Sequence, residues 1–128
     1  MSFLFPRKQE VLDIQGRLIE TFGGAHGLRD EGALESALAA AENRAHYENA
    51  GLAVCAATYA YHFTQAHAFV DGNKRVAAAG SEIFLEINGA RLIATNEQIV
   101  ELFLDIAASK LSRGEVKSFF HRRTTSET

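Results

Sequence analysis

The chain of 128 residues has a single proline, Pro6, and behind it apolar residues recur at three- and four-residue intervals almost to the end. Proline is the residue that most strongly interrupts a helix, so nothing after Pro6 prevents helices from forming. Hydrophobic residues make up 47% of the chain, which is enough to bury a core at this length. We therefore expect an all-α fold, a compact helical bundle in which residues 1–128 form a single domain.

Capping and glycine signals predict the limits of the first two helices. A helix over Arg7–Thr21 is predicted by an apolar stripe of Val11, Ile14, Leu18 and Phe22. The pair Gly23–Gly24 ends it, as glycines just past a helix often do. Asp30 is a suitable N-cap for a second helix, which we expect to run to about Asn43. The mixed polarity of residues 44–49 gives no assignment there.

Two mostly apolar helices are predicted to lie in the middle of the bundle. The segment Leu52–Thr64 is apolar nearly all round, which is typical of a buried helix. The second segment, Asn73–Glu86, is also mostly apolar and ends at Asn88–Gly89. Small residues in both helices would permit close packing. Tyr59 and Cys55 belong to the first of these helices, and we expect both to pack in the core.

The C-terminal third carries two signals for helix starts. A short extended stretch is expected at Arg91–Ile93, and apolar residues at helical spacing follow it. Two capping boxes, each with a glutamine or glutamate three residues after a hydroxyl side chain, predict the starts: Thr95 with Gln98, and Ser112 with Glu115. The tail from about His121 to Thr128 is polar, and we expect it to be frayed.

One run between the two central helices carries the chemistry of the chain: His67-Ala68-Phe69-Val70-Asp71-Gly72-Asn73-Lys74-Arg75. Glycine lets backbone amides approach an anion, and the helix that begins at Asn73 directs its positive end to the same place. Asp71 suits Mg²⁺, which takes carboxylate and phosphate oxygens together. Lys74 and Arg75 neutralise phosphate charge, and His67 accepts a proton near neutral pH. The set indicates a phosphate chain with a divalent metal.

The run resembles the Fic/Doc signature His-x-Phe-x-Asp/Glu-Gly-Asn-Gly/Lys-Arg. Lys74, where the nucleotide-transferring Fic branch usually has glycine, resembles the death-on-curing (Doc) branch. A second stretch, Gly27-Leu28-Arg29-Asp30-Glu31-Gly32-Ala33-Leu34-Glu35-Ser36-Ala37-Leu38, is similar to the Doc-type early segment. The resemblance extends from about Val11 to His121. It implies a helical fold, which agrees with the fold expected from the apolar spacing.

The resemblance also implies a role for each motif residue. His67 would be the general base that deprotonates a hydroxyl of a target protein, and Asp71 would hold Mg²⁺. ATP, or another nucleoside triphosphate, would be the co-substrate. Its phosphates would contact Gly72, Asn73, Lys74 and Arg75. Phosphoryl and nucleotidyl transfer depend mainly on positioning and charge stabilisation, which these residue types supply.

Departures from the signature separate two enzymatic outcomes. The nucleotide-transferring branch usually has a second arginine three positions after the first, where this chain has Ala78. Together with Lys74, this favours the Doc branch, a protein kinase-like phosphotransferase whose target class is elongation factor Tu. Ala68 and Val76 replace a common proline and a common threonine, and neither change removes a group used above. Two alternatives stay open: transfer of AMP to a protein hydroxyl, and a non-catalytic module that binds nucleotide or a partner.

The Doc-like interpretation also implies a regulatory partner. Many Fic proteins contain an inhibitory helix of the form Ser/Thr-x-x-x-Glu-Gly/Asn, and this sequence contains no match to it. The toxin of a toxin-antitoxin pair would instead be inhibited by an antitoxin protein supplied in trans, which folds onto the toxin on binding. We expect that partner to cover the groove beside Lys74 and Arg75.

Composition narrows the other classes of partner. The net charge is −3, so no basic field draws the chain to nucleic acid. Polar residues interrupt every apolar stretch before it reaches the length of a membrane span. The single cysteine, Cys55, has no partner for an internal disulfide and fits a reducing compartment, so we expect a cytoplasmic protein. His62, five residues before His67, lacks the i, i+4 spacing of a metal pair and is expected to be structural.

Overall fold

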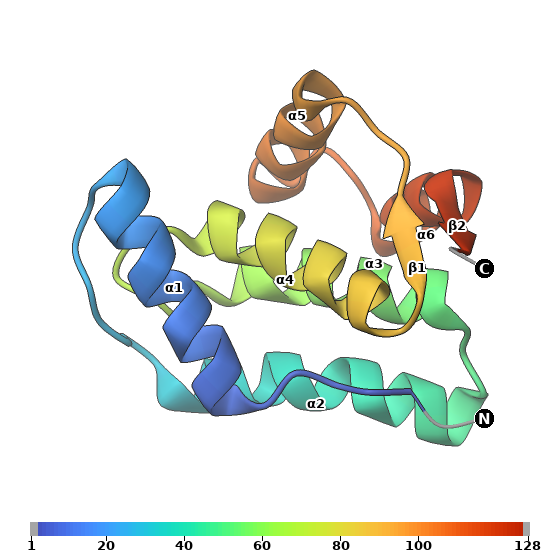
Figure 1. Cartoon of the computed structure of the whole chain (residues 1–128), viewed down its shortest axis with the longest axis horizontal. Coiled ribbons are helices and arrows are strands. Elements are labelled where there is room, and N and C mark those ends of the chain that lie inside the picture. Colours follow the sequence, from blue (N-terminus) through green and yellow to red (C-terminus); the bar gives the residue numbers. More distant parts are fainter. Residues whose placement is uncertain (1–2, 127–128) are drawn as a thin grey trace.

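Helix α3 (Leu52–Ala66) lies at the centre of the fold, and four other helices pack against it. The computed structural model describes residues 3–126 and shows how the helices surround this centre (Figure 1). The remaining elements are α1 (Lys8–Phe22), α2 (Glu31–Glu48), α4 (Asn73–Ile87), β1 (Ala90–Leu92), α5 (Asn96–Ala107), α6 (Arg113–Arg123) and β2 (Thr124–Ser126). Helices α2, α4, α5 and α6 contact α3, while α1 packs mainly on α4. The predicted helical bundle is confirmed.

Local signals placed most helix ends correctly. The Asp30 carboxylate accepts a hydrogen bond from the Ala33 N–H at 3.0 Å and so caps α2. Both predicted capping boxes are present, at the starts of α5 and α6. Helix α2 continues through most of the unassigned stretch and ends at Glu48, where Asn49 adopts the left-handed conformation with φ 53°.

The buried face of α1 differs from the predicted stripe. Its buried residues are Val11, Gln15 and Ile19, which recur at four-residue intervals, whereas Phe22 is 59% exposed. The stripe was assigned from apolar residues alone, so it missed the glutamine at its centre. Gln15 is buried because it has hydrogen-bond partners at the candidate site.

The prediction of a frayed end is wrong for His121–Ser126. Helix α6 continues to Arg123, and β2 then pairs antiparallel with β1, so that Ala90 faces Ser126 and Leu92 faces Thr124. The extended stretch predicted near residue 91 is confirmed as β1, and its unpaired edge provides the backbone partners that the polar tail needs. Glu127 and Thr128 lie outside the described residues.

Phe84 of α4 is fully buried and joins the N-terminal segment to the core. Its ring stacks on Phe5 with the centroids 5.5 Å apart and meets Tyr59 edge-on at 5.2 Å. The Asn88 side chain exchanges two hydrogen bonds with the Leu4 backbone, at 2.8 and 2.9 Å.

Over residues 3–126, no helix is both long and apolar enough to cross a membrane.

Helices α3 and α4 pack closely because their facing residues are small. A Cβ added at Gly80 would lie 3.4 Å from the Phe63 ring, at the limit of ordinary van der Waals contact, so the ring packs directly on the α4 backbone at this glycine. Cys55 is buried beside α2, where its Sγ lies 3.8 Å from the Ala41 carbonyl oxygen, and its burial was expected from the sequence. Burial raises the pKa of its thiol to about 11, so the thiol is neutral near pH 7 and packs as an apolar group.

Tyr59 offers a stability test of the core. Its side chain is fully buried and its hydroxyl has no hydrogen-bond partner among the described residues. Burial is the main cause that raises the pKa of this phenol. A buried hydroxyl without a partner is destabilising, so we expect Tyr59→Phe to raise the free energy of unfolding by about 1 kcal/mol. Urea denaturation measures this, with Tyr47→Phe at an 80% exposed position as the neutral control. A loss of stability in Tyr59→Phe would show that the hydroxyl has a buried partner, such as water.

Candidate functional site

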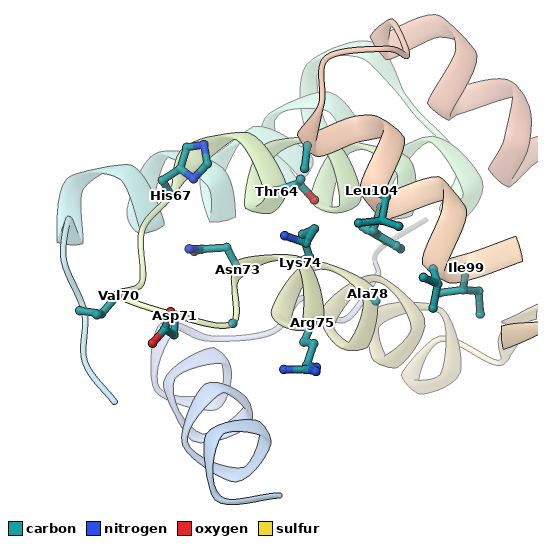
Figure 2. A pocket seen from close by; sticks show the side chains of 14 residues that line it. Thr64, His67, Val70, Asp71, Asn73, Lys74, Arg75, Ala78, Ile99 and Leu104 are labelled. Atoms are coloured by element: carbon teal, nitrogen blue, oxygen red, sulfur yellow. The ribbon is translucent and has the colours of Figure 1, made fainter. Parts of the chain in front are cut away.

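A cavity of about 550 Å³ opens between the turn that joins α3 to α4 and the facing side of α5. This volume lies within the usual range of small-molecule sites. Figure 2 shows the side chains that line it. One end is formed by the predicted site residues His67, Asp71, Gly72, Asn73, Lys74 and Arg75. The other end is an apolar wall from α5, made of Ile99, Val100, Phe103, Leu104 and Ala107. All six predicted residues therefore share one cavity.

His67 ends α3 in a conformation that few side chains adopt. Its backbone is left-handed, with φ 49° and ψ 42°, and its side chain is exposed at the cavity. The Arg29 guanidinium donates a hydrogen bond to the His67 carbonyl oxygen at 2.9 Å. This bond holds the turn from which the imidazole projects. Arg29 belongs to the Doc-like early segment, but this contact was not predictable from the residues alone.

The loop after His67 is fixed from both sides. Phe69 is 2% exposed and anchors the loop in the core, as predicted. Asn73 clamps the same residue: its Oδ1 accepts from the Phe69 N–H and its Nδ2 donates to the Phe69 carbonyl, both at 3.0 Å. The Ala68 carbonyl accepts from the N–H groups of Arg29 and Asp30 at 2.7 and 3.0 Å. The Asn73 side chain is thus engaged in shaping the loop, which leaves its backbone N–H as the group that could bind a ligand.

The start of α4 has the features of an anion cradle. Gly72 precedes it in the left-handed conformation, with φ 82°, and no side chain of the described residues caps this end. The helical hydrogen bonds begin with the Val76 N–H donating to the Gly72 carbonyl at 2.8 Å. The amides of Asn73, Lys74 and Arg75 precede that bond and point outward with the positive end of the helix dipole.

The two motif cations leave α4 in different directions. In Figure 2, Lys74 extends toward Thr64 and the interior of the cavity, whereas Arg75 projects from the opposite side of α4. The Arg75 guanidinium lies 4.6 Å from the centre of the Phe22 ring on α1, within cation–π range. Lys74 is therefore the cation directed into the cavity, and Arg75 lies at its edge. Phe22 is 59% exposed, so this contact lies at the surface.

Asp71 has one side-chain oxygen bound and one available. Its Oδ2 accepts from the Ala25 N–H at 2.7 Å, which ties the motif to the glycine-rich loop 23–27. Among the described residues, Asp71 is the one acidic side chain that lines the cavity, and no group of three or more metal-binding side chains occurs. A single carboxylate suits Mg²⁺, which keeps several waters and takes its other ligands from phosphates. The residues present therefore fit the expected metal.

Gln15 is the residue that sequence reasoning missed most clearly. It is 4% exposed, and its Nε2 donates to the carbonyls of Asp71 and Ala25 at 3.2 and 3.4 Å. It thus joins α1 to both the motif and the glycine-rich loop. Its position between Val11 and Ile19 on one face of a helix was a usable signal, because a buried polar side chain needs partners. The α5 wall had no comparable signal beyond its apolar spacing.

Replacing Gln15 by methionine tests this link. Methionine has a similar size but no donor, so the carbonyls of Asp71 and Ala25 lose a partner. We expect Gln15→Met to lower the free energy of unfolding by about 1 kcal/mol in urea denaturation. Gln9→Met on the same helix, where the glutamine is exposed, is the matched control and should change stability by less than about 0.5 kcal/mol. Equal effects at both positions would mean that the Gln15 bonds contribute no more than the exposed bond from Gln9 to Asp13.

Comparison with known proteins gives a family for this arrangement. The family model described as Fic/DOC matches residues 5–85, which is more than half of the chain and includes the whole motif. Helices α5 and α6 lie outside the matched part. None of the curated proteins matches the chain. The match, together with the motif that lines the cavity at the start of α4, shows that the chain belongs to the Fic/DOC family.

Proposed function

We propose that this member of the Fic/DOC family is a Doc-like protein kinase, the toxin of a toxin-antitoxin pair, which transfers phosphate from ATP to a hydroxyl of a translation factor similar to elongation factor Tu. The observation that supports this most is the cation pattern of the cavity. Lys74 extends into it, and Ala78, one helical turn later, contributes only a methyl group to the wall. The second cation that the nucleotide-transferring branch places there is missing, which favours the γ-phosphate as the transferred group.

The proposed reaction needs one proton acceptor beside the phosphate chain. His67 is exposed at the cavity and takes the proton of the target hydroxyl as that oxygen attacks the γ-phosphorus. A new oxygen–phosphorus bond forms, the bond to the bridging β–γ oxygen breaks, and ADP leaves with the electron pair. The left-handed backbone of His67, held by Arg29, fixes the base in place before substrate binds.

The start of α4 would hold the phosphates. The outward amides of its first turn and the Lys74 ammonium offer donors that are already oriented, so little reorganisation accompanies charge transfer. Arg75 would add its charge from the edge of the cavity. Asp71 would hold Mg²⁺, which neutralises phosphate charge when bound. The apolar α5 wall would receive the nucleoside of ATP, since ligand sites usually combine a large apolar surface with a few polar groups.

An antitoxin in trans would cover this cavity. Support comes from the large apolar residues that remain exposed: Val70, Val100 and Leu104 are each at least half exposed, and all three line the cavity. Exposed apolar side chains gathered around one cavity are typical of sites where a partner binds. The antitoxin would place apolar residues on this wall and a carboxylate near Arg75. If the chain expressed alone were harmless to cells while catalysing transfer in vitro, the toxin role would be contradicted.

Intact mass spectrometry tests the proposed reaction. The purified chain is incubated with Mg²⁺, ATP and elongation factor Tu, and the mass of the factor is then measured. We expect a gain of one phosphate that requires His67. A gain of AMP would instead assign the chain to the nucleotidyl-transferring branch. An unchanged factor, under conditions in which the chain still binds ATP, would contradict the proposed target and favour a binding module.

A further inference from the structure

A second cluster of basic side chains lies between α2, α3 and α6 and shares no residue with the motif cavity. It surrounds a small cavity lined by Arg44, Thr58, Tyr61, His62, Arg113 and Lys117. Four of these side chains are cationic or become cationic on protonation, and they come from three different helices. None of the described residues that line the cavity is acidic. This concentration of positive charge contrasts with the net charge of −3 of the whole chain.

The cations of this cluster are poorly paired within the chain. Arg44 makes only long contacts: its Nη1 donates to Thr58 Oγ1 at 3.4 Å, and its Nε lies 3.5 Å from a carboxylate oxygen of the exposed Glu48. The buried Nε has no hydrogen-bond partner. Neither Arg113 nor Lys117 forms an ion pair with any of residues 3–126. The cluster therefore has donors to offer to a ligand from outside the chain.

His62 lies in the positive field of this cluster. Its imidazole is half-buried, and burial, followed by the charges of Arg113 and Arg44, lowers its pKa. Arg113 also stands in the first turn of α6, where the helix dipole disfavours a cation. An anion bound among these side chains would relieve both unfavourable interactions. The same anion would favour the protonated form of His62, which provides a local probe of binding.

We propose that the cluster of Arg44, His62, Arg113 and Lys117 binds an oxyanion, which is either free inorganic phosphate or the acidic side chains of a partner protein. The cavity is far smaller than a nucleotide site, so the ligand is a single phosphate or carboxylate group at its mouth. Arg113 and Lys117 are exposed and reach it from α6, and Arg44 reaches it from α2. The hydroxyls of Thr58 and Tyr61 add neutral polar groups from α3.

The imidazole resonances of His62, followed by NMR at constant ionic strength, test the proposal. The probes are sodium phosphate in one arm and a short oligoglutamate peptide in the other. Saturable shifts with phosphate indicate a free anion, and saturation with the peptide alone indicates a partner's carboxylates. In either arm we expect Arg113→Gln with Lys117→Gln to weaken binding at least about tenfold, because two charge-assisted contacts are lost. Lys117→Ala alone should weaken it less.

A matched control removes the same charge elsewhere. Arg17→Gln with Lys110→Gln replaces two exposed cations outside this cavity and should leave the affinity unchanged. If both double variants weakened binding equally, the effect would depend only on net charge, and the proposal would be overturned. Absence of saturation with both probes would also overturn it. Shifts of His67 without shifts of His62 would place phosphate in the motif cavity only, which is equally incompatible with the proposed second site.

Discussion

Replacing His67 by alanine is expected to slow phosphate transfer to the target by about 10²–10⁴-fold, the usual contribution of a positioned general base. His67 is the one histidine among the described residues that line the cavity, and its imidazole is the proton acceptor that the proposed reaction needs. Without it, the target hydroxyl must lose its proton to water. The side chain is exposed, so alanine removes little buried surface. The rate is measured from the mass of the target at a series of early times.

A second variant of His67 is needed to separate loss of the base from a change in the turn. Alanine is disfavoured in the left-handed conformation that His67 adopts, whereas asparagine enters it readily and is not a base. If His67→Ala and His67→Asn lose the same activity, the imidazole is responsible. If His67→Asn stays active, the alanine effect arises from the turn and His67 is not the base. His26→Ala, which removes an exposed histidine from the neighbouring glycine-rich loop, is the control and should keep the wild-type rate.

Helix ends were predictable because their signals are local. A hydroxyl or carboxylate at an N-cap satisfies amides within the next three residues, so the sequence around Asp30, Thr95 and Ser112 was sufficient. The elements that were misjudged depend on distant partners. β2 forms because β1 lies beside the end of α6, and the buried face of α1 includes Gln15 because the motif loop receives its hydrogen bonds. Neither partner is near in the sequence.

The candidate site was likewise predictable only in part. Its chemical groups fall within nine consecutive residues, so their presence in one cavity followed from a single turn between two helices. The directions in which these side chains point did not follow from the turn. Lys74 and Arg75 are adjacent in sequence, yet α4 directs them to different sides, and the ring of Phe22 determines where Arg75 lies. The apolar wall from α5 joins the site across more than twenty residues, and only the packing of α5 on α3 and α4 places it there.

The motif contains two kinds of residue. His67, Asp71 and Lys74 present groups to the cavity, while Phe69 and Asn73 hold the loop that presents them. Phe69 and Asn73 are constrained as well, since an amide that clamps both backbone groups of one residue leaves little choice of side chain. A signature made of both kinds is therefore a more specific sign of this site than its charged members alone.

Phe69→Ala tests whether Phe69 holds the motif loop in place. We expect this variant to lower the free energy of unfolding by about 3–5 kcal/mol. The ring is 2% exposed, so alanine removes buried apolar surface and leaves a cavity beneath the motif loop. Domains of this size are stable by only about 5–15 kcal/mol, so the loss is a large share of the total. Urea denaturation measures it. Phe69→Leu, which keeps most of the apolar volume, should lose less.

Phe22→Ala is the matched control, because it removes the same side chain from a position that is 59% exposed. There the loss is limited to partial burial and the contact with Arg75, which together amount to about 1 kcal/mol. Comparable losses in the two variants would show that the core does not hold the motif loop through Phe69. A large loss in Phe69→Ala alone, with His67→Asn as stable as the wild type, would separate the two roles: Phe69 keeps the turn in place, and His67 presents the base from it.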